Sequence, residues 1–265
     1  MSASGLPHRE HASRSISSKR EVPSQAVYLL DADPDLADVL DAEDRAAARG
    51  YAVTKVRSIA EGPWRADTEY EGEHDVVALL VLGGLLTREL RLGTRTATEL
   101  LGTGDLLRPW QDDEGRPGVR ARWCVHEELR LAVLDRRVML IAARWPALAD
   151  ALFARAFRRV RALAFSLAMS QLQGIDRRLL VLFWEAANRW GRVTPEGVRV
   201  RLPLTHHTLA DLVGSRRPSV SLALGALADR EEVIKLGDEW LLRGQPPVID
   251  PSTDRARPIV RAPQR

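Results

Sequence analysis

The chain of 265 residues contains a single cysteine, Cys124. One cysteine excludes an internal disulfide and an iron–sulfur cluster held by this chain alone, and no cysteine or histidine grouping has zinc spacing. We expect Cys124 to be a small core residue. A haem on His74 or His126 stays open but is not favoured, because a lone histidine on a strand is usually structural. The sequence therefore predicts no metal and no cofactor.

Long hydrophobic runs are also missing, so we expect no membrane span and no membrane partner. Residues 1–24 are rich in serine, arginine and histidine and have no apolar centre, which is unlike a secretory signal. We expect a cytoplasmic protein with a disordered tail at 1–24 and a flexible tail at 245–265. Because no phosphate-cradling glycine motif or nucleophile with its base stands out, the chain is not expected to be an enzyme.

The net charge of +3 is mild, but the charges are unevenly distributed. Acidic residues gather at 31–44 and 67–75, whereas arginines gather at 155–161 and 216–217. The two halves of the chain are therefore expected to have different roles.

Residues 204–224 have the pattern of two short helices around a tight turn. Thr205 can cap the first helix, Gly214 supplies the turn, and Pro218 suits the first turn of the second helix. Apolar residues follow at spacings that give each helix one buried face: Leu209, Leu212, Val213, Val220, Leu224 and Leu227. The pattern predicts a helix-turn-helix.

Polar residues lie at the start of the second helix, which in such a motif meets base edges and phosphates of DNA. The candidate DNA-binding residues there are Arg216, Arg217, Ser219 and Ser221. Residues 233–242 follow as two apolar segments joined by Gly237 and Asp238, a typical hairpin turn. A hairpin directly after a recognition helix predicts a winged helix-turn-helix.

The N-terminal half alternates apolar segments with glycines, which is typical of an antiparallel roll. We expect strands at 76–82, 85–92, 94–101, 120–125 and 128–134. Trp64, Trp110 and Trp123 are expected to fill the core of this roll, although they could line a pocket. Arg120 or Arg122 could bind an anion, but exposed strand arginines are favoured.

Residues 26–36 look like the first strand and acidic pair of a phosphorylation receiver domain. A receiver needs a third carboxylate after a later strand, and the strand at 76–84 ends in glycines instead. We therefore do not favour a receiver and expect one or two short helices here, with Asp33 and Pro34 as a start signal.

Residues 146–173 are expected to form one long helix that begins at Pro146. Its apolar residues recur at alternating steps of four and three, which is typical of a coiled-coil seam. The expected homodimer interface consists of Phe153, Ala156, Val160, Leu163 and Leu167. The alternative is a stripe that lies on the chain's own roll. Beyond this helix, Asp176 is expected to cap the next helix, at 177–190, and 198–202 to form a strand.

The order of roll, long helix and winged helix-turn-helix, with the segments at 102–107 and 212–221, resembles the Crp/Fnr family of bacterial transcription regulators over residues 25–244. The resemblance implies a homodimer that binds double-stranded DNA at a two-fold symmetric operator, with RNA polymerase as a further partner. It assigns a guanine contact to Arg217 and phosphate contacts to Thr205, His206 and His207.

Two departures from the family pattern limit what it implies. Arg108, Pro109 and Trp110 stand where cyclic-nucleotide-binding members have a glycine and a glutamate, so a cyclic nucleotide is not expected and the effector is unknown or absent. Pro218 and Leu222 stand where the family's catabolite activator has a glutamate and a second arginine in the recognition helix. The operator sequence should therefore differ from the one that the catabolite activator binds.

These observations predict an α+β fold: an antiparallel, jelly-roll-like β-roll at 25–145, a dimerisation helix at 146–173 and a winged helix-turn-helix at 174–244. The expected function is sequence-specific transcription regulation. The alternative is a receiver-like or ligand-binding signalling module that does not read DNA sequence.

Overall fold

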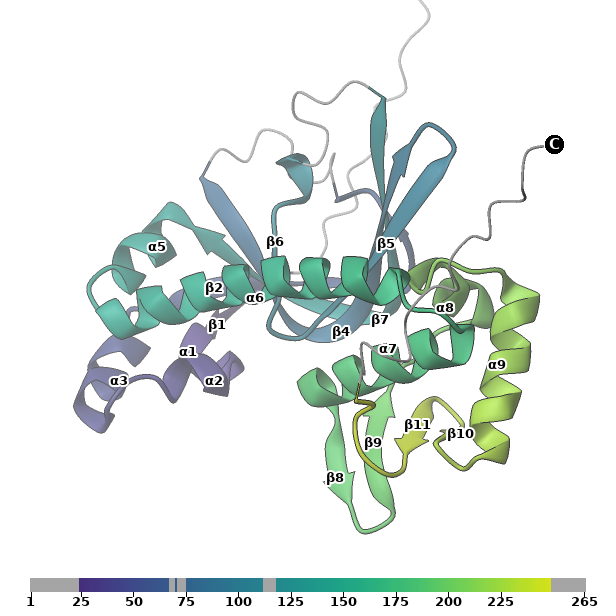
Figure 1. The fold of residues 1–265 in the computed structure, drawn as a ribbon. Helices are drawn as coiled ribbons and strands as arrows, with labels where there is room; N and C mark the ends of the chain where they lie inside the picture. The colour runs from purple at the N-terminus through teal and green to yellow at the C-terminus, as the bar shows by residue number, and fades with distance from the viewer. Residues whose placement is uncertain (1–23, 67–69, 71–74, 112–117, 249–265) are drawn as a thin grey trace, which may run out of the picture.

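The computed structural model describes residues 24–66, 70, 75–111 and 118–248, so most of both expected tails and His74 lie outside the described residues (Figure 1). The N-terminal part is an antiparallel roll with the strand order β1-β2-β7-β4-β5, in which β3 pairs with β7 and β6 with β4. Its strands are β1 (Ser24–Tyr28), β2 (Val53–Ile59), β3 (Gly62–Trp64), β4 (Val76–Leu92), β5 (Arg95–Gly102), β6 (Leu106–Leu107) and β7 (Val119–Asp135).

Strands β4 and β7 are each 17 residues long and run through the whole roll. The expectation of two shorter strands in each region was wrong. Gly83 and Gly84 bend β4 through register shifts without ending it. Only glycine fits at position 84, because its φ is +93° and an added Cβ would overlap the carbonyl oxygen of Glu128.

Short helices close one end of the roll: α1 (Leu29–Ala32), α2 (Pro34–Ala37), α3 (Ala42–Arg49) and α5 (Arg136–Ala142). Asp33 caps α2 by accepting a hydrogen bond from the Leu36 amide at 3.2 Å, which confirms the expected start signal. Strand β1 pairs antiparallel with β2, as do all strand pairs in the described residues, whereas a receiver has a parallel sheet. The likeness to a receiver was therefore misleading.

The long helix α6 (Pro146–Ser170) runs along the roll and joins it to the C-terminal part (Figure 1). It begins at the expected proline and ends a few residues before the expected position. Leu148, Leu152, Arg155 and Met169 form its buried side. Most of the expected seam lies on another side and is exposed.

The C-terminal part packs three helices against a four-stranded sheet of order β10-β11-β9-β8. Its elements are α7 (Ile175–Trp190), β8 (Arg192–Thr194), β9 (Gly197–Arg201), α8 (His206–Leu212), α9 (Arg217–Asp229), β10 (Val233–Leu236) and β11 (Glu239–Leu242). Strand β8 was not expected. Asp176 is not the cap of α7 as expected, because the helix starts two residues earlier than expected, at Ile175 after Gly174 with φ +87°.

The roll has its own aromatic core, in which Trp64 and Trp123 are buried with ring centroids 5.8 Å apart. The expectation of core tryptophans is confirmed for these two, whereas Trp110 is only partly buried and packs against this core, 5.7 Å from the ring of Tyr70. Cys124 is only partly buried, so its expected place in the core was wrong. Burial still raises the pKa of its thiol.

His126, the other candidate haem ligand, is half-buried in the roll and lies 2.8 Å from the Thr87 hydroxyl. Burial lowers the pKa of its imidazole. In the described part of the chain, no three histidine, cysteine or acidic side chains are placed to hold a metal ion. No helix among the described residues is long and apolar enough to cross a membrane.

The turn Gly102–Asp105 connects the roll to both long helices. Its Asp105 carboxylate is buried, accepts a hydrogen bond from the Gly102 amide at 2.9 Å, and pairs with Arg189 of α7 at 2.6 Å. The Gly104 carbonyl accepts a hydrogen bond from Arg158 of α6 at 3.1 Å. This turn therefore sets the position of α6 and α7 relative to the sheet.

A buried ion pair fixes α6 to the short N-terminal helices. The Arg155 guanidinium donates two hydrogen bonds of 2.7 Å to the two carboxylate oxygens of Asp33. Both side chains are almost fully buried. We expect Arg155→Ala to lower the free energy of unfolding by about 3–5 kcal/mol, because the Asp33 carboxylate would remain buried without its partner. Urea denaturation measures this change.

The matched control is Arg49→Ala, since Arg49 makes a similar two-bonded pair with Asp31 in solvent. Its effect should be far smaller because solvent screens exposed pairs. Equal effects of the two substitutions would contradict a special role for the buried pair.

Candidate nucleic-acid interface

Local signals position the two helices of the helix-turn-helix. The Thr205 hydroxyl accepts a hydrogen bond from the Thr208 amide at 3.1 Å, as expected of a cap. Gly214 adopts φ +63° in the turn, and Pro218 lies in the first turn of α9. From α7, Arg178 donates a hydrogen bond of 2.8 Å to the Val213 carbonyl and so holds the turn from behind.

The expected apolar residues of both helices are buried in a single core with α7 and the wing. They are Leu209, Leu212, Val213, Val220, Leu224 and Leu227. This packing leaves the opposite side of α9 at the outer edge of the molecule, facing away from the roll (Figure 1).

Arg216 and Arg217 are exposed at the N-terminus of α9. Neither guanidinium has an ion-pair partner within the residues that the structure describes. Arg216 occupies the capping position without a side-chain hydrogen bond, so the first amides of α9 stay open. Two free cations and a helix N-terminus together make a surface suited to phosphate and to base edges.

The other candidate residues fall into two groups. His206 lies with Ser221, because its Nδ1 is 2.9 Å from the Ser221 hydroxyl, which also donates to the Arg217 carbonyl at 3.1 Å. Ser219, in the first turn of α9, is partly buried. His207 instead pairs with Asp211 at 3.0 Å.

His207 and Asp211 line a cleft of about 640 Å³ between α8 and the roll, which Trp123 and His126 also line. Burial raises the pKa of Asp211, while its contact with His207 lowers it. His207 is thus separated from the group around Arg217, and its expected DNA contact stays a prediction.

The arginines of α6 have a different environment from those of α9. Arg155 is buried against Asp33. Arg159 pairs with Glu99 through hydrogen bonds of 2.8 and 2.9 Å and also reaches the Leu106 carbonyl at 3.0 Å. These charges attach the helix to the roll, so part of the basic cluster at 155–161 is not a binding surface.

The hairpin β10–β11 lies beside α9, as expected of a wing. Gly237 turns it with φ +65°. Trp240 is buried against Phe183 of α7, with ring centroids 4.7 Å apart, and its indole nitrogen donates to the Leu202 carbonyl at 3.1 Å. The wing is therefore fixed to the domain core.

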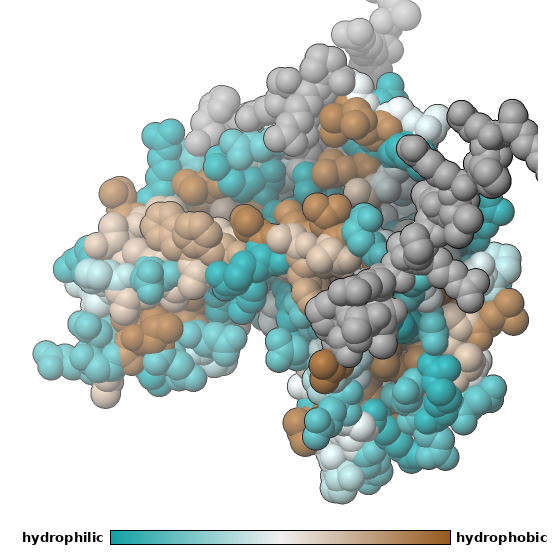
Figure 2. Space-filling view, in the orientation of Figure 1, coloured by the Kyte–Doolittle hydropathy of each residue, from teal (hydrophilic) through white to brown (hydrophobic). Residues whose placement is uncertain are grey.

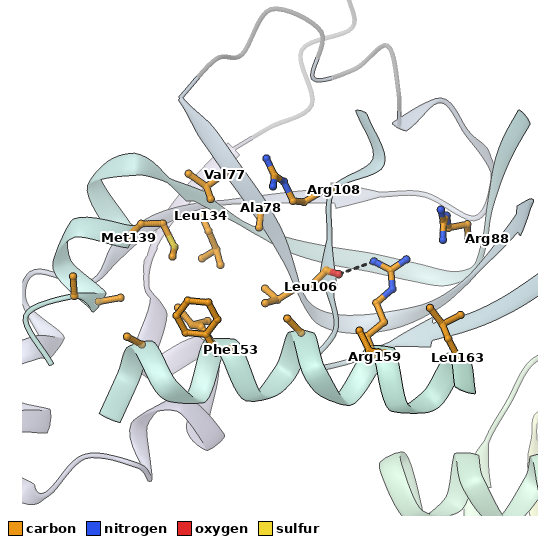
Figure 3. A pocket seen from close by; sticks show the side chains of 16 residues that line it. Val77, Ala78, Arg88, Leu106, Arg108, Leu134, Met139, Phe153, Arg159 and Leu163 are labelled. Carbon is orange, nitrogen blue, oxygen red and sulfur yellow. Dashed lines mark hydrogen bonds between the residues drawn. The ribbon is translucent and has the colours of Figure 1, made fainter. Parts of the chain in front are cut away.

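A second feature is an apolar cavity of about 650 Å³ between the roll and α6 (Figure 3). Val77, Leu134 and Met139 line it from the side of the roll and α5, and Phe153 projects into it from α6. Arg108 lies at its edge, while Arg159 is held by the Leu106 carbonyl. Among its described lining residues there is no acidic side chain.

The expected dimer residues coincide with this cavity. Phe153, Ala156, Val160 and Leu163 line it, and Leu167 continues the same stripe with 68% of its surface exposed. Apolar side chains follow α6 on the face shown in Figure 2. The stripe is therefore not covered by the chain's own roll, which was the alternative.

Sequence reasoning missed Arg178, the cavity and the inward role of Arg155. Each depends on partners far away in the chain: the Asp33 carboxylate is 122 residues from Arg155, and the Val213 carbonyl is 35 residues from Arg178. No local pattern marks such pairs. Arg120 and Arg122 are exposed strand arginines, as expected.

Residues 177–241 match the model of the Crp-like helix-turn-helix domain. No curated protein matches the chain. Among solved structures, a cyclic nucleotide-binding domain containing protein from Listeria monocytogenes is similar at 15% identity and a TM-score of 0.56, over 79% of this chain and 96% of that one.

A CooA mutant from Carboxydothermus hydrogenoformans is similar at 18% identity and a TM-score of 0.54, over 71% of this chain and 83% of that one. FixK2 from Bradyrhizobium japonicum is similar at 16% identity and a TM-score of 0.52, over 72% and 93%. Residues 177–241 therefore form a Crp-like helix-turn-helix domain, and the chain shares the fold of these solved structures.

Proposed function

We propose that the protein is a homodimeric transcription regulator that reads a palindromic operator and carries a sensor site in its roll. DNA-binding transcription regulation itself follows from the Crp-like domain. The proposal includes no catalytic step and places the protein in the cytoplasm, where it would meet DNA and RNA polymerase.

The observation that carries this proposal is the pair of free arginines at the open end of α9. Other basic residues of the chain, such as Arg155, Arg159 and Arg189, are held by carboxylates inside the molecule. Arg216 and Arg217 keep their full charge and donors for a ligand. A guanidinium in the major groove can donate two hydrogen bonds to guanine, so Arg217 is the proposed base-reading residue.

The exposed stripe of α6 supports the dimer. An apolar stripe on a helix that is otherwise attached to the roll by arginines is suited to pairing with the same stripe of a second copy. Two copies would present two recognition helices, which is the arrangement that a palindromic operator requires.

The cavity beside this stripe supports a sensor role. Its apolar lining suits a small apolar molecule, with Arg108 available for an acidic group at the edge. The described residues that line the cavity include no acidic side chain, which disfavours a cyclic nucleotide, since the family pattern uses a glutamate to hold the ribose.

The direct test of the function is selection of bound fragments from sheared genomic DNA with the purified full-length protein at near-physiological salt. We expect recovery of a palindromic motif, and binding that weakens steeply with added salt through counterion release. If no motif is recovered, with or without cell extract, the signalling or interaction module becomes the better description.

Arg217→Ala should weaken binding to the selected operator by about 1–3 kcal/mol and leave weak non-specific binding largely intact, because only a base contact is lost. Fluorescence anisotropy with operator and scrambled duplexes measures both. Arg161→Ala is the control, since it removes an exposed arginine of α6 outside the DNA-binding domain. If Arg217→Ala binds the operator as tightly as the parent, Arg217 does not read a base.

Val160→Glu should convert the dimer into monomers, because it places two like charges opposite each other at the centre of the stripe. Val160 has 61% of its surface exposed, so the change should leave the protomer folded. Light scattering gives the mass. Ala154→Glu, on an exposed part of α6 outside the stripe, should remain dimeric. A Val160→Glu protein that stays dimeric would locate the interface elsewhere.

A further inference from the structure

The solvent face of α9 offers few groups that can form hydrogen bonds with bases. After Arg217 at its start, this face presents no carboxylate, amide or second guanidinium until the end of the helix, and consists of Pro218, Ser221, Leu222 and Gly225. The Ser221 hydroxyl is already engaged by the Arg217 carbonyl and by His206. The helix therefore has few side chains that could distinguish bases by hydrogen bonding alone.

Leu222 is the most conspicuous residue of this face, with 78% of its surface exposed. A single exposed leucine is ordinary on a protein surface and would carry no inference by itself. Here it is exposed five positions after Arg217, on the helix that would enter a major groove, where the one apolar group of the bases is the C5-methyl of thymine.

Gly225 gives an independent observation on the same face. A glycine inside a helix costs about 1 kcal/mol relative to alanine. Its φ is not positive, and a Cβ added there would meet nothing within 4 Å. Neither the backbone nor the packing of the protein requires glycine here, but close approach of a ligand would.

We propose that α9 reads its half-site by apolar fit: Leu222 packs on a thymine methyl, and Gly225 leaves room for the nearby sugar-phosphate backbone. This inference rests on the proposed function and specifies one base of each operator half-site, a thymine. Arg217 and Leu222 are five positions apart, about 7.5 Å along the helix axis. The thymine should therefore lie about two base pairs from the guanine that Arg217 contacts.

The test replaces each thymine of the selected operator with deoxyuridine, which removes only the C5-methyl and preserves base pairing. At one position per half-site, the parent protein should bind about fourfold more weakly, the equivalent of one buried methyl group. Leu222→Ala should bind the thymine and uracil operators equally. Leu140→Ala, which trims a leucine with 72% exposure on α5 at the other end of the molecule, should respond as the parent does (Figure 1).

Gly225→Ala tests the second half of the inference. The variant should be as stable as the parent or more so in thermal unfolding, because alanine favours the helix and its methyl group has space. Its affinity for the operator should nevertheless fall about tenfold, since the methyl group would overpack the interface. A stable variant with undiminished operator affinity would overturn the proposed close approach.

The outcomes separate this inference from the proposed function. Suppose that a palindrome is recovered and Arg217→Ala weakens operator binding. If no uracil substitution then lowers the affinity, or if Leu222→Ala still distinguishes thymine from uracil, the proposed thymine contact is wrong and the proposed regulator function is retained. If no palindrome is recovered at all, both fall, and the exposed leucine would be available to a protein partner.

Discussion

The turn Gly102–Asp105 is the constraint on which the arrangement of the whole molecule depends. It joins β5 to β6 within the roll, and its polar groups are taken up by arginines of both long helices, Arg158 from α6 and Arg189 from α7. Gly102 leaves room for the ring of Trp190, since an added Cβ would lie 2.7 Å from it. A four-residue turn thus determines how the helix-turn-helix is oriented relative to the sheet. Any shift of the turn would displace both helices.

The arginines of this chain fall into a structural group and a group available for DNA binding. Arg155 and Arg159 of α6 and Arg189 of α7 are paired with buried or partly buried carboxylates, where removal of one partner is costly. Those at the start of α9 are solvated and unpaired within the described residues. The net charge of the chain does not show this difference, because it counts both kinds equally.

The sequence predicted the helix-turn-helix and wing well because their signals are local: the Thr205 cap, the Gly214 turn and the Gly237 turn act within a few residues. It failed at β4, where glycines at 83–84 resemble a strand break but the ladder to β7 continues past them. It also failed to identify the role of Arg155, since a buried arginine and a solvated one look alike until the partner, Asp33, is placed. The candidate DNA surface was thus predictable from the sequence. The cavity and the ion pairs and hydrogen bonds that connect the roll to the long helices could be identified only from the three-dimensional structure.

The cavity beside α6 and the exposed stripe share Phe153, Ala156, Val160 and Leu163. In the proposed dimer, occupancy of the cavity and association of the two chains cannot be independent equilibria, because each changes the surface that the other uses. By thermodynamic reciprocity, any effector that tightens the dimer must itself bind more tightly to the dimer, by the same factor. In such a protein the concentration of the chain sets its sensitivity to the signal, so a cell could retune the response by changing expression alone.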